Sequence, residues 1–430
     1  MEKKQYNQIN ETVYQETLAN GLKALLVPKP ELEQTYGVFT TNYGSIDNQF
    51  VPLGEMNMVQ VPDGIAHFLE HKLFEKEDHD VFQEFTALGS SANAFTSFTK
   101  TAYLFSTTTE IKKNTEILLN FVQDPYFSES SVEKEKGIIA QEIQMYDDQP
   151  DWRAFFGIIE TMYQDHPVKI DIAGTVDSIQ NITKDDLYTC YHTFYHPSNM
   201  TFCLVGAFDA EEMLQVIRDN QSQKSFDPVQ AIKRERIVEP AHVNKEHAVL
   251  HMPVVTEKCM IGIKETTTER PDDFIKAELM SEMILDYFYS KSGAYYQELY
   301  DLDLIDGSLG FETERQISFA FSLIGANSTD VEQFKEVVLR QLDTFKTYTF
   351  SDETFTRMKR KMIGGLMREM NSTSNIANSV SQYHFLGIDY FDLLPTLEAI
   401  TKDEVEAFMH QWIKSDNVAS FFIKKETENA

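Results

Sequence analysis

The sequence lacks the features that mark a secreted or membrane protein. It has only three cysteines in 430 residues, Cys190, Cys203 and Cys259. Because three scattered thiols cannot form a disulfide framework, they indicate a reducing compartment. No segment approaches the roughly 18 consecutive apolar residues of a membrane-spanning helix. The N-terminal residues also contain no apolar run like that of a signal peptide. We therefore expect a cytoplasmic protein that does not enter a membrane.

Basic residues are scarce as well. Lys and Arg number 38 against 68 Asp and Glu, which gives a formal net charge of −30. Because such a chain repels phosphate groups, neither a nucleic acid nor an anionic membrane is an expected partner. Solubility is the simplest interpretation of the charge. The alternative is that part of it lines a site for basic peptides.

What is present is the composition of a folded protein with more than one core. Hydrophobic residues make up 42% and charged residues 25%, and at about 150 residues per domain the length predicts two or three domains. Alternating apolar residues over 92–98 and 101–107 predict neighbouring strands. Residues 130–146 predict a long helix whose apolar face includes Ile138 and Ile143. The expected class is α+β, with antiparallel-rich sheets covered by helices.

A repeated pattern divides the chain into two halves. The segment Ile182-Thr183-Lys184-Asp185 recurs in the second half as Ile400-Thr401-Lys402-Asp403, and each copy precedes an Asn-containing turn and an apolar strand. Upstream, a similar helix opening also recurs, at nearly the same spacing. Agreement of several features indicates duplication. We predict two homologous domains, 1–225 and 246–430, joined by a polar linker, 226–245.

The motif that carries chemistry is His67-Phe68-Leu69-Glu70-His71. On a helix, histidines at positions i and i+4 project from one face, so two imidazoles can bind one Zn²⁺ ion. Glu70 flanks the same face and can take a proton from a water that the metal activates. The alternative is two unrelated histidines on a helix.

The surroundings of this motif favour a helix. A turn at Pro62-Asp63-Gly64 precedes it, and Ile65 starts an apolar face. We expect the helix to run from Ile65 to Glu75 with Asp63 as its N-cap.

A catalytic zinc site needs a third protein ligand. The predicted helix over 130–146 offers Glu135 and Glu142, which lie two turns apart on one face. Either could reach the metal, and the other would then orient a histidine. Periodicity alone leaves an equal alternative, a solvated acidic face beside lysines.

These residues resemble those of the pitrilysin/insulinase family of inverzincin metallopeptidases. The segment Glu135–Ile143 is similar to the helix that carries the family's third ligand, and Asn93-Ala94-Phe95-Thr96 is similar to its active-site edge strand. The segment His196–Met200 resembles the turn that ends its first domain. The chain length resembles that of the mitochondrial processing peptidases and of the zinc-bearing member of a paired set in Gram-positive bacteria.

The resemblance implies a zinc metalloendopeptidase that hydrolyses peptides or unfolded segments in an enclosed chamber. One Zn²⁺ per chain would be held by His67, His71 and Glu142, with Glu135 orienting a histidine and Glu70 as the general base. Asn93, Ala94 and Phe95 would hold an extended peptide substrate by adding it as a strand. An ordinary exposed edge strand is the alternative for that segment.

The second half departs from the family pattern. Many members have an Arg and a Tyr there, and alignment on 297–299 puts Tyr300 and Gly307 at those places. The second half also has no His-x-x-Glu-His motif. It is therefore predicted to be a domain without zinc, and the chain is expected to form a homo- or heterodimer with a paralogous subunit. Two alternatives remain, a non-catalytic structural subunit and a zinc hydrolase that acts on a non-peptide bond.

Overall fold

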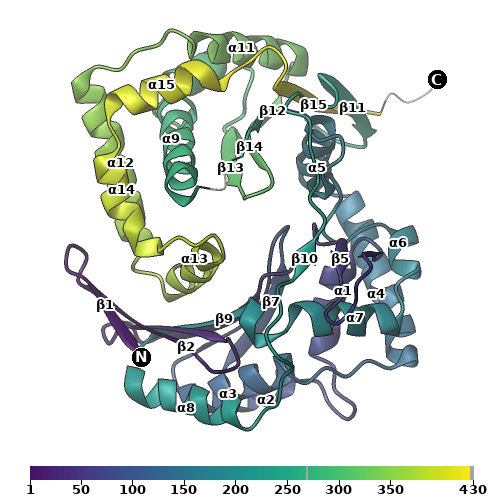
Figure 1. Cartoon of the computed structure of the whole chain (residues 1–430). Coiled ribbons are helices and arrows are strands. Elements are labelled where there is room, and N and C mark those ends of the chain that lie inside the picture. Colours follow the sequence, from purple (N-terminus) through teal and green to yellow (C-terminus); the bar gives the residue numbers. More distant parts are fainter. Residues whose placement is uncertain (268–269, 427–430) are drawn as a thin grey trace. The chain divides into compact units, whose positions relative to one another are not determined.

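The computed structural model describes residues 1–267 and 270–426, which form two compact units (Figure 1). Each unit is assembled from three separate stretches of the chain. Unit 1 comprises Met1–Ile143, Asp171–Arg236 and Met367–Phe391. Unit 2 comprises Gln144–Ile170 and Ile237–Leu366, together with the chain that follows Phe391. The predicted α+β class is confirmed, since both units combine a sheet with helices.

Unit 1 is built on a seven-stranded sheet with the order β1-β2-β3-β9-β4-β8-β7. All pairs are antiparallel except β3 with β9. The strands are β1 (Glu2–Tyr6), β2 (Glu11–Thr17), β3 (Lys23–Pro28), β4 (Thr35–Thr41), β7 (Ser91–Thr96), β8 (Thr101–Thr107) and β9 (Met200–Gly206). A small second sheet contains β5 (Gln49–Val51), β6 (Val59–Gln60) and β10 (Lys233–Arg234).

The helices of unit 1 cover this sheet. They are α1 (Ile65–Leu73), α2 (Phe82–Ala87), α3 (Ile111–Val122), most of α4 (Glu129–Asp147), α6 (Val176–Gln180), α7 (Lys184–Phe194), α8 (Ala210–Ser222) and α13 (Thr373–Phe385), with a 3₁₀ turn at Pro197–Asn199. Alternation along β9 shows how the two faces are used. Phe202 and Leu204 belong to the core that includes α1, α3, α7 and α8. Cys203 points the other way, where it meets the Ser381 hydroxyl on α13.

The sheet of unit 2 repeats the part of this arrangement that runs from β3 to β7. Its five strands have the order β11-β15-β12-β14-β13, which corresponds to β3-β9-β4-β8-β7, and only β11 with β15 is parallel. The strands are β11 (His247–Met252), β12 (Glu257–Glu265), β13 (Gly310–Arg315), β14 (Ala320–Ser328) and β15 (Val418–Lys425).

The helices of unit 2 follow the same plan. They are α5 (Pro150–Met162), α9 (Pro271–Tyr289), α10 (Ala294–Asp301), α11 (Val331–Thr344), most of α12 (Asp352–Glu369), α14 (Leu393–Ala399) and α15 (Lys402–Trp412), with a 3₁₀ turn at Pro167–Lys169. A further 3₁₀ turn, Tyr390–Asp392, lies where the chain passes from unit 1 to unit 2.

The two units exchange one helix each. Helix α5, from the first half of the chain, packs on β12 and β15 of unit 2, and α13, from the second half, packs on β4 and β9 of unit 1. The fit of α5 is close, because a Cβ atom at Gly157 would lie 2.3 Å from the ring of Phe421. Neither α5 nor α13 is predicted from the sequence. The linker predicted at 226–245 was drawn from the repeat in the sequence, and it stays a prediction.

The start of α1 differs from the expectation. Its N-cap is Gly64, at φ 88°, and no side chain caps the helix. Asp63 does not cap α1, because its carboxylate accepts a hydrogen bond from the Asn48 side chain at 2.9 Å. The backbone needs glycine here, since a Cβ at Gly64 would lie 2.3 Å from the carbonyl oxygen of Ala173. Helix α1 also ends at Leu73 rather than at Glu75.

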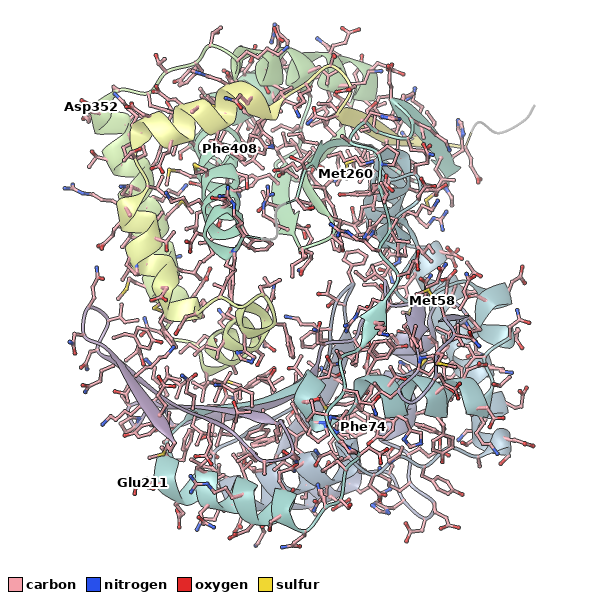
Figure 2. The ribbon with its side chains drawn as sticks, in the orientation of Figure 1. Met58, Phe74, Glu211, Met260, Asp352 and Phe408 are labelled. Carbon is pink, nitrogen blue, oxygen red and sulfur yellow. The ribbon has the colours of Figure 1, made fainter. Side chains whose placement is uncertain are left out.

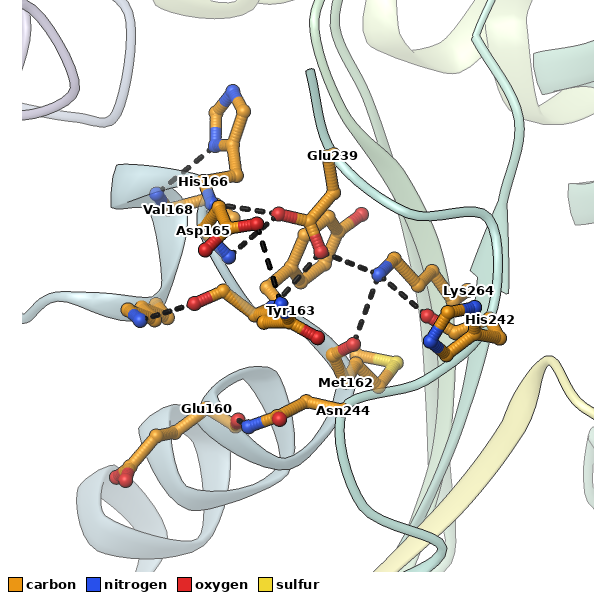
Figure 3. Close-up of polar contacts among 12 residues, drawn as sticks. Glu160, Met162, Tyr163, Asp165, His166, Val168, Glu239, His242, Asn244 and Lys264 are labelled. Atoms are coloured by element: carbon orange, nitrogen blue, oxygen red, sulfur yellow. Dashed lines mark hydrogen bonds and ion pairs between the residues drawn. The ribbon is translucent and has the colours of Figure 1, made fainter. Parts of the chain in front are cut away.

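A buried ion pair ties the segment after β10 to unit 2 (Figure 3). The Lys264 ammonium group, on a side chain that is 2% exposed, lies 2.5 Å from the Glu239 carboxylate and donates to the carbonyl oxygens of Met162 and His242. Glu239 also accepts hydrogen bonds from the backbone N–H groups of residues 164–166 at 2.7–2.8 Å. Burial raises the pKa of Glu239, but Lys264 and these N–H groups outweigh it and hold the pKa below its usual value.

We expect Lys264→Met to lower the free energy of unfolding by about 3 kcal/mol, because it leaves a buried carboxylate without its cation. Urea denaturation followed by tryptophan fluorescence measures this loss. Lys346→Met is the matched control, since Lys346 pairs with Asp343 at the exposed surface and such pairs contribute at most about 1 kcal/mol. Equal effects of the two substitutions would contradict the structural role of the buried pair.

Candidate metal centre

Helices α1 and α4 bring two histidines and a glutamate together. The Nε2 atom of His67 lies 3.8 Å from Glu142 Oε1, and the Nε2 atom of His71 lies 3.5 Å from Glu142 Oε2. One ligand atom from each of the three residues lies within 4.8 Å of the other two. Within the described part of the chain, no other group of three such residues meets this condition.

These donors fit a zinc ion. Bonds of about 2.0–2.2 Å in a tetrahedron separate ligand atoms by about 3.3–3.5 Å, which is close to the separations of 3.8 and 3.5 Å between the imidazole nitrogens and the Glu142 oxygens. Two imidazoles and a carboxylate are also a known donor set of catalytic zinc sites, in which the fourth position is left for water. His67, His71 and Glu142 could therefore hold a divalent metal.

The packing of α1 sets the direction of both histidines. Phe68 and Leu69 are fully buried in the core of unit 1. Phe74, which follows the helix (Figure 2), stacks on Phe82 with ring centroids 4.2 Å apart. His67 and His71, which are four residues apart on the opposite side of the helix, then face away from the core. Their rings lie 4.6 Å apart.

The two histidines have different electrostatic surroundings. Burial and the neighbouring charge of His71 lower the pKa of His67 to about 3, so its imidazole is neutral, the form that binds metals. Burial also lowers the pKa of His71, but the hydrogen bond to Glu135 and the charges of Glu70 and Glu142 outweigh it, and the pKa is raised. The Nδ1 atom of His67 is buried and has no hydrogen-bond partner among the described residues.

The structure places the two candidate glutamates of α4, Glu135 and Glu142, differently. Glu142 faces the Nε2 atoms, whereas Glu135 Oε1 lies 3.1 Å from Nδ1 of His71. This contact favours the tautomer with a proton on Nδ1, which leaves the Nε2 lone pair free toward Glu142. The prediction that Ile138 lies on the apolar face of α4 is wrong, because Ile138 is 45% exposed. Ile143, predicted on the same face, is buried.

Glu70 lies beside this group. It is 9% exposed, and its Oε2 atom accepts a hydrogen bond from the Thr96 hydroxyl at 2.7 Å. Burial raises the pKa of Glu70, although the bond from Thr96 acts in the opposite direction. Thr96 was missed as a site residue, and the signal that could have found it is its place directly after Asn93-Ala94-Phe95.

Asn93, Ala94 and Phe95 lie on β7, the strand at one edge of the seven-stranded sheet. Strand β7 pairs with β8 on one side only. The N–H group of Ala94 donates to the side-chain oxygen of its neighbour Asn93 at 2.9 Å, and Phe95 is half-buried. The described edge is therefore open to another strand, and Thr96 ends it next to Glu70.

Among its described residues, the second half has no equivalent donor set. Helices α4 and α12 are the corresponding long helices of the two copies, and they begin at Glu129 and Asp352. When the two helices are aligned at these starts, Met358 takes the place of Glu135, and Gly365 takes the place of Glu142. Gly365 has no side-chain donor, and Met358 offers a thioether in place of a carboxylate.

Comparison with known proteins places the chain in a family. The family model for insulinase, peptidase family M16, matches residues 50–176, which include the whole donor set. YmfH of Bacillus subtilis (strain 168), described as an uncharacterized zinc protease, is 47% identical over 415 residues, or 96% of this chain and 97% of that protein. The chain belongs to peptidase family M16.

Other comparisons extend the M16 likeness to the whole chain. A model described as the peptidase M16 inactive domain matches residues 181–362. The crystal structure of an M16-like peptidase from Alicyclobacillus acidocaldarius has a TM-score of 0.93 and 37% identity, covering 97% of this chain and 99% of that one. The mitochondrial-processing peptidase subunit beta of Saccharomyces cerevisiae is 23% identical over 364 residues, or 80% of this chain and 78% of that protein. Among the described residues, no helix is long and apolar enough to cross a membrane.

We expect His67→Ala to lower zinc affinity by about 100-fold or more, because it removes one of three donors. The measurement is zinc per chain after dialysis against a competing chelator. His192→Ala is the control, since His192 also has a histidine four residues later, His196, but is exposed and outside the donor set. A full zinc content in the His67 variant would contradict the assignment.

Proposed function

We propose that this chain is a zinc-dependent metalloendopeptidase of family M16 that hydrolyses peptides or unfolded segments. The observation that carries the proposal is the meeting of three donors, His67, His71 and Glu142, beside a buried carboxylate, Glu70. The zinc-protease descriptions of relatives support the reaction class.

Each site residue has a part in the proposed reaction. His67, His71 and Glu142 hold one zinc ion per chain, and Glu135 fixes the ring of His71. The bound ion would supply Lewis acidity to the scissile carbonyl and lower the pKa of the attacking water. Glu70 accepts the proton of that water and later gives it to the leaving amine. Its raised pKa suits a group that must both take and release a proton.

We propose that the substrate binds along strand β7. An extended peptide can add to its open edge through main-chain hydrogen bonds, at Asn93, Ala94 and Phe95. Such pairing fixes the peptide backbone without reading most side chains, which suits a peptidase that acts on unfolded segments.

We expect Glu70→Gln to keep one zinc per chain and to lower peptide hydrolysis by about 1,000-fold, because an amide cannot accept the proton. Zinc analysis and cleavage of a peptide library measure the two properties. Glu133→Gln is the control, since Glu133 lies on α4 with an exposed carboxylate.

If Glu70→Gln abolished hydrolysis and left the cellular role intact, the structural-subunit alternative would be favoured. Cleavage of another bond by the wild type would favour the non-peptide hydrolase.

We further propose that hydrolysis requires a second, paralogous subunit, in a cytoplasmic homo- or heterodimer. Tyr300 and Gly307 stand where many family members have an Arg and a Tyr, so this chain lacks those substrate-holding groups. The description of one relative as a subunit supports an assembly. The family model for residues 181–362, named an inactive domain, agrees with a second half that does no chemistry.

A paralogous subunit from the same organism should raise peptide hydrolysis at least tenfold, a change of about 1.4 kcal/mol in the activation barrier. The assay compares the zinc-loaded chain alone, the paralogue alone and the mixture, with sedimentation velocity to detect the dimer. Full activity of the chain as a monomer would contradict this proposal.

A further inference from the structure

We propose that Thr96 positions Glu70 for proton transfer and links that carboxylate to the peptide-binding edge of β7. This inference rests on the proposed function, because it assigns a positioning role within the same site. Its direct observation is the 2.7 Å hydrogen bond from the Thr96 hydroxyl to Glu70 Oε2.

The hydrogen bond from Thr96 leaves the two carboxylate oxygens of Glu70 in different environments. Oε2 of Glu70 is occupied by the Thr96 hydroxyl, whereas Oε1 has no hydrogen bond with any described residue. A glutamate side chain has several rotamers, and restricting it before the reaction lowers the entropy lost in the transition state. One oxygen is thus anchored while the other stays available for the proton of the attacking water.

A hydroxyl group is chemically suited to this position. A lysine or arginine at the same place would hold the carboxylate by charge and strongly lower its pKa. The neutral hydroxyl of Thr96 restricts Glu70 without placing a positive charge beside the carboxylate.

Thr96 is itself fixed from the neighbouring strand. It pairs with Thr101 of β8, whose hydroxyl lies 3.5 Å from that of Thr96 and donates to the carbonyl oxygen of Tyr43 at 2.9 Å. Thr101 is fully buried. The hydroxyl that holds Glu70 is therefore part of the rigid sheet and not of a loop.

The position of Thr96 along β7 connects it to the substrate. It lies two residues after Ala94, which is about 7 Å along a strand. A peptide that pairs with β7 would hold the strand in place, and the same strand carries the group that orients Glu70. Binding and alignment of the base are thereby coupled through one short segment.

The test compares Thr96→Val, which removes the hydroxyl with little change in shape, with Thr96→Ser, which retains it. The full zinc-loaded chain is assayed with its partner subunit if one is required. Thr107→Val is the matched control, because Thr107 is a buried threonine of β8 whose hydroxyl donates to the Thr109 carbonyl oxygen. If Thr96→Val does not fold, Thr96→Ala makes the same comparison.

The expected result is a loss in kcat without a loss in binding. Thr96→Val should lower kcat about tenfold, the effect of one lost hydrogen bond to a charged group, and change KM by less than about twofold. Zinc content should stay at one per chain. In a Glu70→Gln background, where peptide is not consumed, Thr96→Val should leave peptide affinity by fluorescence anisotropy unchanged. Thr96→Ser and Thr107→Val should retain kcat within about threefold.

Other outcomes overturn the inference. An unchanged kcat in Thr96→Val would show that the hydroxyl does not position the base. A loss confined to KM, peptide affinity or zinc content would assign Thr96 to binding instead. Failure of the proposed function looks different, because the wild type would then cleave no peptide or Glu70→Gln would remain active.

Discussion

The burial of α1 in the core of unit 1 is the constraint on which the candidate metal centre depends. Phe68, Leu69 and Leu73 are fully enclosed, and each such side chain contributes about 1.5–3 kcal/mol of hydrophobic stabilisation. The helix can therefore neither rotate nor slide without exposing them. Because residues four apart share a helical face, this packing directs His67 and His71 toward Glu142 on α4.

The same burial determines the chemistry of the side chains. It lowers the pKa of His67 and raises that of Glu70, so the His67 imidazole is neutral and the neighbouring carboxyl retains its proton affinity. Carboxylates gathered around two imidazoles repel one another in a site of low polarity. A divalent cation among His67, His71 and Glu142 would offset this repulsion, so metal binding and folding are expected to support each other.

The two copies share their architecture but differ at the candidate metal centre. Each copy has a long helix, α4 or α12, that passes from one compact unit to the other. The passage lies after Ile143 in α4 and after Leu366 in α12, which are equivalent positions when the two helices are aligned at their first residues. Both copies keep this crossing and the same central strand order. At the aligned positions, α4 has the carboxylates Glu135 and Glu142, whereas α12 has Met358 and Gly365.

Local sequence patterns determined the α+β class, the helix that carries His67 and His71, and the neighbouring strands β7 and β8. These features depend on the short periods of helices and strands and on tight turns, so they can be predicted from neighbouring residues.

Tertiary structure alone decided that Glu135 contacts His71 while Glu142 faces both imidazoles. It also decided that Gly64 and not Asp63 is the N-cap of α1. The exchange of α5 and α13 and the bond from Thr96 to Glu70 join segments far apart in the chain. Such contacts are selected by the packing of a whole core, which no local pattern contains.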